Sequence, residues 1–136
     1  MGDQVIGLFA PRFAGSDHAN VAIRVALEIL RATGHSDSQG PWIPVGIGIH
    51  TGLAYVGAVG TKNGVNEITV LGSAPNLAAR LSSHAADGEI LVSEAAASSA
   101  GLVLENTERR VLELKGIDNP VDTCVLRLGN AKIETT

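Results

Sequence analysis

The sequence predicts an α/β or α+β fold with one mostly antiparallel sheet, and three observations lead to that prediction. Strand-like segments rich in β-branched residues interleave with two segments whose apolar residues recur at helical spacing. An Asn-Gly pair between two strand-like segments is typical of a hairpin. The 136 residues show no repeat and no low-complexity linker, so we expect one domain with a single small core.

The first part of the chain predicts a strand and a helix. Residues 4–9 alternate polar and apolar side chains after a Gly-Asp turn, which is typical of a strand. A break over residues 11–15 follows, and Ser16 or Asp17 offers an N-cap. The expected helix ends at Gly34, and its apolar stripe consists of Val21, Ala22, Val25, Ala26 and Ile29.

The middle of the chain predicts a loop, a long strand, a hairpin and a second helix. Turn-forming residues over 35–41 indicate a surface loop, and the β-branched segment 43–56 indicates one long central strand. Residues 60–64 supply the hairpin turn, from which residues 65–71 return as a strand. A second helix is expected over residues 72–86.

The remaining part of the chain predicts shorter elements. They are a strand over 89–92, an Ala/Ser helix that begins at Ser93, and strands near 102–104, 109–114 and 121–128. Residues 129–136 are expected to form a flexible tail, so the predicted domain covers residues 1–128.

Composition and charge exclude several classes of function. Ten Lys and Arg against fourteen Asp and Glu give a net charge of −4, and without a basic run we expect no nucleic-acid partner. Cys124 is the single cysteine and cannot close an internal disulfide. Since the sequence shows neither a signal peptide nor a bilayer-spanning apolar run, we expect a soluble, cytoplasmic protein without a membrane segment.

Asn76 and Arg80 are the strongest local candidates for chemistry. They lie four residues apart in the second predicted helix, so they share one helix face, where an amide and a fixed cation can hold an anion. Free N–H groups at the start of the helix favour a phosphate nearby. The alternative interpretation is an exposed polar face without a ligand.

Two other residues allow both a functional and an ordinary interpretation. Asp3, at the Gly-Asp turn, is a carboxylate of the kind that binds Mg²⁺, or it only forms the turn. Lys115, between two predicted strands, can present its amine to a phosphate, or it is a solvated lysine in a turn.

The glycine-rich segments and the histidines give weaker signals. Gly46, Gly48 and Gly52 lack the spacing of a phosphate-binding loop, and we expect them to allow close backbone packing or a bulge. The four histidines and Cys124 show no metal-ligand spacing, and His50 is interpreted as a packed, hydrogen-bonded histidine. No serine or cysteine lies in the context of a nucleophile elbow.

The order of the segments adds information that no single motif carries. The sequence shows Gly-Asp at 2–3, GIGIHTG at 46–52, glycines at 57 and 60, LG at 71–72, PNLAARL at 75–81, GEI at 88–90 and LKG at 114–116. This ordered set resembles the catalytic domain of the class III adenylate and guanylate cyclases, from Asp3 to about Leu128.

The resemblance implies a ferredoxin-like α+β domain that acts as a homodimer, with ATP or GTP bound at the interface. The 3′-hydroxyl of the nucleotide would attack the α-phosphorus, and pyrophosphate would leave. By resemblance Asn76 orients the ribose, Arg80 stabilises charge on the α-phosphate and Lys115 contacts the terminal phosphates. Asp3 resembles the second of two metal aspartates that hold Mg²⁺ or Mn²⁺.

Two residues bear on the choice of purine base. Thr69 lies where many adenylate cyclases carry an aspartate that reads the adenine amino group, and a threonine hydroxyl can accept the same hydrogen bond. Val70 would offer its backbone carbonyl to the same edge of the base. The sequence is similar to a branch of adenylate cyclases with threonine at this position, so the resemblance favours ATP over GTP.

The chain also departs from the family pattern. The first metal aspartate and the adenine-reading lysine of the family are absent from this chain. We therefore expect a domain truncated at its N-terminus, without the first strand and first helices, that is weakly active or inactive by itself. Residues 4–9 and 43–56 are then expected to pair as parallel strands, or another chain fills the gap.

Three functions are compatible with these residues. The leading prediction is an adenylate cyclase domain that makes cyclic AMP. The alternative is a non-catalytic cyclase-homology module that dimerises or binds nucleotide to regulate a partner. In a third interpretation, a small binding domain without a nucleotide, the pairing of Asn76 with Arg80 is a coincidence.

Overall fold

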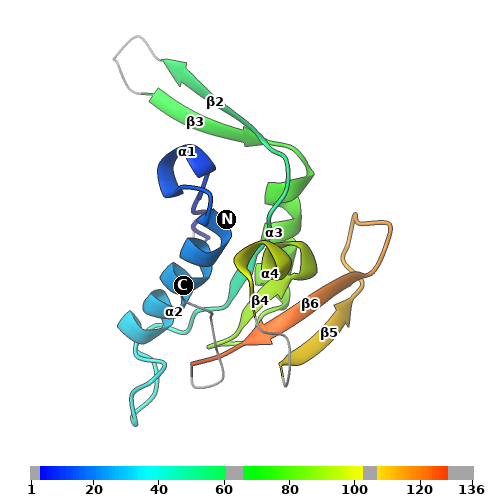
Figure 1. Cartoon of the computed structure of the whole chain (residues 1–136). Helices are drawn as coiled ribbons and strands as arrows, with labels where there is room; N and C mark the ends of the chain where they lie inside the picture. Colours follow the sequence, from blue (N-terminus) through cyan, green and yellow to red (C-terminus); the bar gives the residue numbers. More distant parts are fainter. Residues whose placement is uncertain (1–3, 61–65, 103–106, 129–136) are drawn as a thin grey trace.

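The computed structural model describes residues 4–60, 66–102 and 107–128. Within these ranges helices and strands alternate along the chain (Figure 1). In order they are α1 (Pro11–Ala14), α2 (His18–Ala32), β1 (Ile47–Ile49), β2 (Tyr55–Gly60), β3 (Asn66–Leu71), α3 (Ser73–His84), β4 (Ile90–Ser93), α4 (Glu94–Ala100), β5 (Glu108–Leu112) and β6 (Val121–Leu126).

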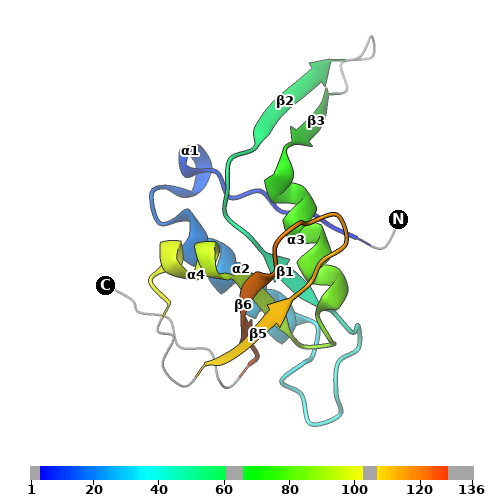
Figure 2. The same ribbon diagram turned by 90° about the vertical axis from the view of Figure 1, so that its right-hand side faces the viewer.

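Four of the strands form one mixed sheet in the order β1-β4-β6-β5. β1 runs parallel to β4, whereas β6 pairs antiparallel with both β4 and β5. β2 and β3 form a separate antiparallel hairpin, which extends away from the rest of the chain in both ribbon views (Figure 1, Figure 2). The predicted α+β class is confirmed, because helices pack on a sheet in which most strand pairs are antiparallel.

The four-stranded sheet lies between two layers, because its strand β4 is apolar on both faces. Ile90 and Val92 pack with α2 and α4, while Leu91 between them packs with Leu81 of α3. Successive residues of a strand point to opposite faces, so β4 is buried along its whole length. Figure 2 shows α3 on one side of the sheet and α2 with α4 on the other.

The predicted first helix is confirmed as α2, and its predicted apolar stripe faces the core only in part. Of the predicted stripe, Val25 and Ile29 are 38% and 42% exposed. Ala26 is buried and Ala22 packs against the core, so the predicted stripe is confirmed at these two residues and is wrong at Val25 and Ile29. Helical spacing alone does not say which side of an apolar stripe meets the sheet. The buried apolar residues of α2 are Ala19, Ile23, Ala26 and Leu30.

The prediction of one long strand over residues 43–56 is wrong, because the structure divides this segment. Only β1 joins the four-stranded sheet, and the chain then leaves it at His50 to form β2 of the hairpin. Gly48 in β1 packs directly on the backbone of α3. A Cβ at this position would lie 2.4 Å from the Ser82 nitrogen and 2.6 Å from the Ala78 oxygen. The close backbone packing expected of Gly48 is therefore confirmed.

The predicted strand over residues 4–9 is also wrong. This segment is irregular, and its apolar residues Val5, Ile6 and Leu8 are exposed. A strand needs a neighbour for its backbone hydrogen bonds, and in the described ranges β1 pairs with β4 rather than with this segment. The expected parallel pairing is contradicted, whereas a strand supplied by another chain stays a prediction. The predicted break over residues 11–15 contains the short helix α1.

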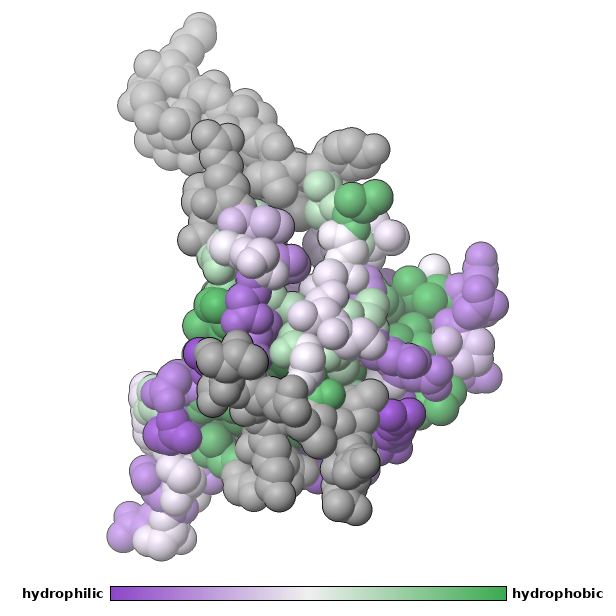
Figure 3. All heavy atoms as spheres, viewed as in Figure 1, coloured by the Kyte–Doolittle hydropathy of each residue, from purple (hydrophilic) through white to green (hydrophobic). Residues whose placement is uncertain are grey.

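The other predicted elements are confirmed with changes at their ends. Ser93 starts α4, because its Oγ accepts a hydrogen bond from the Ala96 N–H at 3.3 Å. The hydrophilic loop over residues 35–41 projects at the lower left of Figure 1 and Figure 3. The turn at 61–64, the segment 103–104 and the predicted tail 129–136 lie outside the described residues. No helix within the described ranges has the length and apolar character to span a membrane.

An ionic network, which the sequence did not predict, joins the start of β4 to β5 and to the residue after β6. Glu89 is buried and accepts hydrogen bonds from Arg110 Nη1 and Nη2, each at 3.2 Å, and from Arg127 Nη2 at 2.6 Å. The Ala86 N–H also donates to Glu89, and Glu108 bridges the two arginines. These donors, Arg110 foremost, lower the pKa of Glu89 to about 2.

Candidate functional site

α3 carries Asn76 and Arg80 as exposed residues. The rotation of the helix is fixed by Leu81, which is fully buried against the sheet, and by Leu77, which packs on the same apolar cluster. Asn76 and Arg80 each precede one of these leucines, so both lie beside the buried stripe and reach solvent. Among the described residues neither has a hydrogen-bond or ion-pair partner, and both are accessible to a ligand.

The first turn of α3 adds backbone donors next to Asn76. Gly72 precedes the helix with a φ of +129°, a conformation that favours glycine, and no side chain within the described ranges caps the helix. The first N–H groups of a helix have no intrahelical partner, and they carry the positive end of its dipole. This end of α3 therefore favours an anion.

The loop that carries Lys115 packs over α3. Leu114 is buried with Leu81 in one apolar cluster, and Ile117 packs against the same cluster. Lys115 is exposed between them. The structure thus brings this lysine to the face of the sheet that α3 covers, the same face as Asn76 and Arg80.

The other predicted site residues are placed only in part. In β3 the backbone of Thr69 pairs with Gly57 and that of Val70 with Val56, and β3 leads within two residues into the start of α3. The side chains of Thr69 and Val70 lie outside the described part of the structure, and so does the whole of Asp3.

The described residues do not form a metal centre. Within residues 4–60, 66–102 and 107–128 no group of three or more His, Cys, Asp or Glu side chains could hold an ion. Asp3, the carboxylate expected to be a ligand, lies outside these ranges. The fit of a metal to this chain therefore rests on the family and not on the observed geometry.

His50 forms a contact between distant segments that sequence reasoning did not find. Ile49 of β1 lies opposite Val92 of β4, so His50 and Ser93 are the next residues along these parallel strands. The atoms His50 Nδ1 and Ser93 Oγ are 2.7 Å apart. Burial lowers the pKa of His50, which favours the neutral ring. The prediction of a packed, hydrogen-bonded histidine is confirmed, although its partner follows only from the strand pairing.

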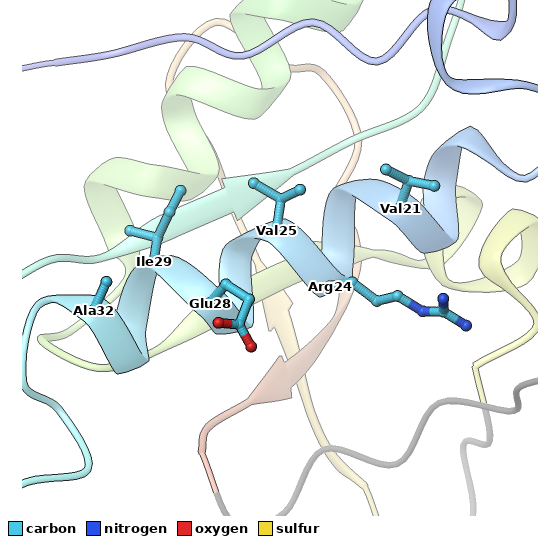
Figure 4. A pocket seen from close by; sticks show the side chains of 6 residues that line it. All are labelled: Val21, Arg24, Val25, Glu28, Ile29 and Ala32. Atoms are coloured by element: carbon cyan, nitrogen blue, oxygen red, sulfur yellow. The ribbon is translucent and has the colours of Figure 1, made fainter.

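A hollow of about 510 Å³ lies along the exposed face of α2, and its lining does not include Asn76, Arg80 or Lys115. Figure 4 shows the side chains that line it, all from this one helix. The hollow contains one cation and one carboxylate and none of the predicted site residues. It is lined by Val21, Arg24, Val25, Glu28, Ile29 and Ala32.

Comparison with known proteins agrees with the motif order. The family described as the adenylate and guanylate cyclase catalytic domain matches residues 4–127. Because this match covers most of the sequence, the chain belongs to that family. A comparison with curated protein sequences finds no match.

Solved cyclase structures have the same fold. The guanylate cyclase domain of RhGC from Catenaria anguillulae, solved with GTP, matches at 22% identity and a TM-score of 0.66 over 88% of this chain and 62% of that chain. The guanylyl cyclase Cya2 matches at 25% identity and a TM-score of 0.67, over 88% and 64% of the two chains. The adenylyl cyclase CyaB from P. aeruginosa matches at 27% identity and a TM-score of 0.54, over 88% and 64%.

These matches define the chain as part of a nucleotide cyclase domain. The chain spans less than two thirds of the length of the solved domains that it matches. Both guanylyl and adenylyl cyclases are among them, so the comparisons leave the purine preference open.

Proposed function

We propose that this chain is part of an adenylate cyclase, which converts ATP to 3′,5′-cyclic AMP and pyrophosphate. The observation that carries the proposal is the pair of exposed residues Asn76 and Arg80 on α3, in a chain that matches the cyclase family over residues 4–127. In the reaction the ribose 3′-oxygen forms a bond to the α-phosphorus and loses its proton. The bond from the α-phosphorus to the bridging oxygen breaks, and pyrophosphate leaves.

The three residues on the α3 side of the sheet take different parts in this reaction. Arg80 stabilises the negative charge that develops on the α-phosphate, a role that suits a planar, permanently charged guanidinium. Asn76 orients the ribose by hydrogen bonds from its amide. Lys115 holds the terminal phosphates, and the open start of α3 contributes its positive dipole end.

The proposed preference for ATP rests on Thr69. A threonine hydroxyl accepts a hydrogen bond from the amino group of adenine, whereas guanine presents a carbonyl oxygen at that place on the ring. Val70 would accept from the same edge through its backbone carbonyl. Both residues belong to β3, which leads into α3, so the base and the ribose would be bound by consecutive segments.

Two further components are proposed from the family. The cyclase family uses divalent metals, and Asp3 is proposed to hold Mg²⁺ or Mn²⁺, which would neutralise phosphate charge when bound. A homodimer is proposed as the assembly that completes the nucleotide site. We also propose a cytoplasmic location, where ATP is available.

The second candidate function is a non-catalytic cyclase-homology module that dimerises or binds nucleotide to regulate a partner. It is compatible with the family match over residues 4–127, which does not by itself establish turnover. It is opposed by the presence together of Asp3, Asn76 and Arg80 in the sequence.

Nucleotide binding tests both functions against a domain without a nucleotide role. The chain is titrated with α,β-methylene ATP and Mn²⁺ by calorimetry, and we expect saturable binding that Lys115→Ala weakens about tenfold. Arg24→Ala is the matched control, because Arg24 is an exposed cation on α2 and lies away from the site. Absence of saturable binding, or an equal loss in both variants, would contradict the proposed site.

A further inference from the structure

Ser93 links His50 to the start of α4. Ser93 is 2% exposed, and its Oγ accepts a hydrogen bond from the Ala96 N–H at 3.3 Å. A serine hydroxyl has one proton to donate, and the bond from Ala96 leaves that proton free. His50 Nδ1, at 2.7 Å, accepts it when the ring is neutral with its own hydrogen on Nε2. The cap of α4 and the end of β1 are thus joined by one chain of hydrogen bonds.

The residues that follow His50 lie against the first turn of α3. A Cβ added to Gly52 would be 3.2 Å from His50 Nε2 and 3.3 Å from the Ala74 Cβ. A Cβ added to Gly72 would be 3.3 Å from the carbonyl oxygen of Leu53. The His50 ring, Gly52 and Ala74 are therefore in close contact, and this segment supports α3 at its beginning.

We propose that His50 is a positioning residue, which fixes residues 50–53 between the cap of α4 and the first turn of α3. The consequence for chemistry rests on the proposed function, because Asn76 follows Ala74 by two residues and is proposed to orient the ribose. When the bond to Ser93 is lost, residues 50–53 lose their anchor on the sheet side. The first turn of α3 then samples other positions, and Asn76 is correctly placed for less of the time.

Two variants of His50 separate the hydrogen bond from the packing. His50→Asn keeps an acceptor oxygen close to the place of Nδ1, so it can still receive the Ser93 proton. His50→Phe keeps a ring of similar size and removes the acceptor. Ser83→Ala is the control, because Ser83 is an exposed residue of α3 at the opposite end of the helix.

Amide hydrogen exchange reports on the first turn of α3 without any need for activity. We expect His50→Phe to speed exchange at least about tenfold at the amides of residues 77–79, which hydrogen-bond to the carbonyl groups of the first turn, with a much smaller change over the rest of α3. His50→Asn should remain within about threefold of the wild type, as should Ser83→Ala. Exchange that is unchanged at residues 77–79, or raised equally along the whole chain, would overturn the proposal.

Turnover adds a second measurement in a form of the protein that cyclises ATP. There His50→Phe should lower kcat about tenfold with little change in KM, and His50→Asn should restore most of the rate. If kcat falls only in proportion to the folded fraction, and His50→Asn does not restore it, then His50 merely stabilises the fold. If no form of the protein extended upstream cyclises ATP, the proposed function fails, while hydrogen exchange on this chain still decides the role of His50.

A second substitution covers the case in which His50→Phe does not fold. Ser93→Gly removes the hydroxyl but keeps a residue that is accepted at an N-cap. We expect the same faster exchange at residues 77–79. An unchanged first turn in this variant would equally overturn the proposal.

Discussion

Arg80 is an exposed cation on α3, beside Leu81, which holds the helix on the sheet. Its rigid guanidinium can stabilise charge that appears only as the α-phosphate passes through the transition state. We therefore expect Arg80→Ala to lower kcat by about 10² to 10³ in a form that turns over, with a much smaller change in KM. The measurement is steady-state cyclic AMP formation.

Arg24→Ala serves as the control for Arg80, because it removes an exposed arginine from α2. The circular dichroism and the thermal midpoint of both variants should match the wild type. A comparable kcat in Arg80→Ala would remove Arg80 from the mechanism.

Substitutions of Thr69 test whether this residue determines the preference for ATP over GTP. We expect Thr69→Asp to keep the preference for ATP, since a carboxylate accepts the same hydrogen bond from the adenine amino group. Thr69→Val removes the acceptor, and it should lower the ratio of kcat/KM for ATP over GTP about tenfold. Competition between the two nucleotides measures this ratio. An unchanged ratio in Thr69→Val would argue against a role in base recognition.

Glu89 makes stability depend on pH. Its pKa is about 2 in the folded chain against an ordinary value of 4.5. This difference corresponds to about 2 to 3 kcal/mol, allowing for the partly exposed arginines. A lowered folded-state pKa gives stability that is present above about pH 4.5 and is lost as the pH falls toward about 2.

The variant Glu89→Gln isolates this contribution. At pH 7 its free energy of unfolding in urea should be lower than that of the wild type by about 2 kcal/mol. The difference should shrink as the pH falls below 4.5 and be small near pH 2. A difference that stays constant from pH 7 to pH 2 would show that the carboxylate charge is not responsible.

At the scale of elements, the sequence predicted best where a local signal decides the structure. α2 and α3 follow from apolar spacing, α4 follows from its Ser93 cap, and the β2 and β3 hairpin follows from the Asn-Gly pair in the sequence. The predictions failed where the structure of a segment depends on which other segment it pairs with. Residues 4–9 have a strand pattern without a strand neighbour in the described ranges, and residues 43–56 divide because β1 pairs with β4 whereas β2 pairs with β3.

Gly48 gives a direct test of the packing between β1 and α3. A Cβ there would lie 2.4 Å from a backbone nitrogen of α3, and neither backbone can yield by rotating a side chain. We expect Gly48→Ala to destabilise the chain by about 3 kcal/mol, at the upper end of overpacking costs. Gly101→Ala is the comparison, because its Cβ meets nothing within 4 Å and only its φ of +68° is unfavourable.

The Gly101→Ala variant should lose about 1 kcal/mol of unfolding free energy. Equal losses in the two glycine variants, measured by urea denaturation, would contradict the close contact between β1 and α3.

At the scale of the whole molecule, the candidate site is assembled by the layer that packs on one face of the sheet. Asn76 and Arg80 come from α3, and Lys115 comes from the loop that packs on it. The order of short motifs was enough to predict the family, and it singled out these three residues as candidates. The pairing of His50 with Ser93 was not predictable, because these residues are 43 positions apart and meet only through the register of β1 with β4.

The most direct test of the account is cyclic nucleotide formation from ATP and from GTP with Mn²⁺. It is measured side by side for this chain and for a version extended upstream in the genomic reading frame. We expect the extended form to make cyclic AMP in preference to cyclic GMP, and this chain to make little of either. If the extended form makes neither product although it binds nucleotide, the adenylate cyclase proposal is contradicted and the regulatory module takes its place.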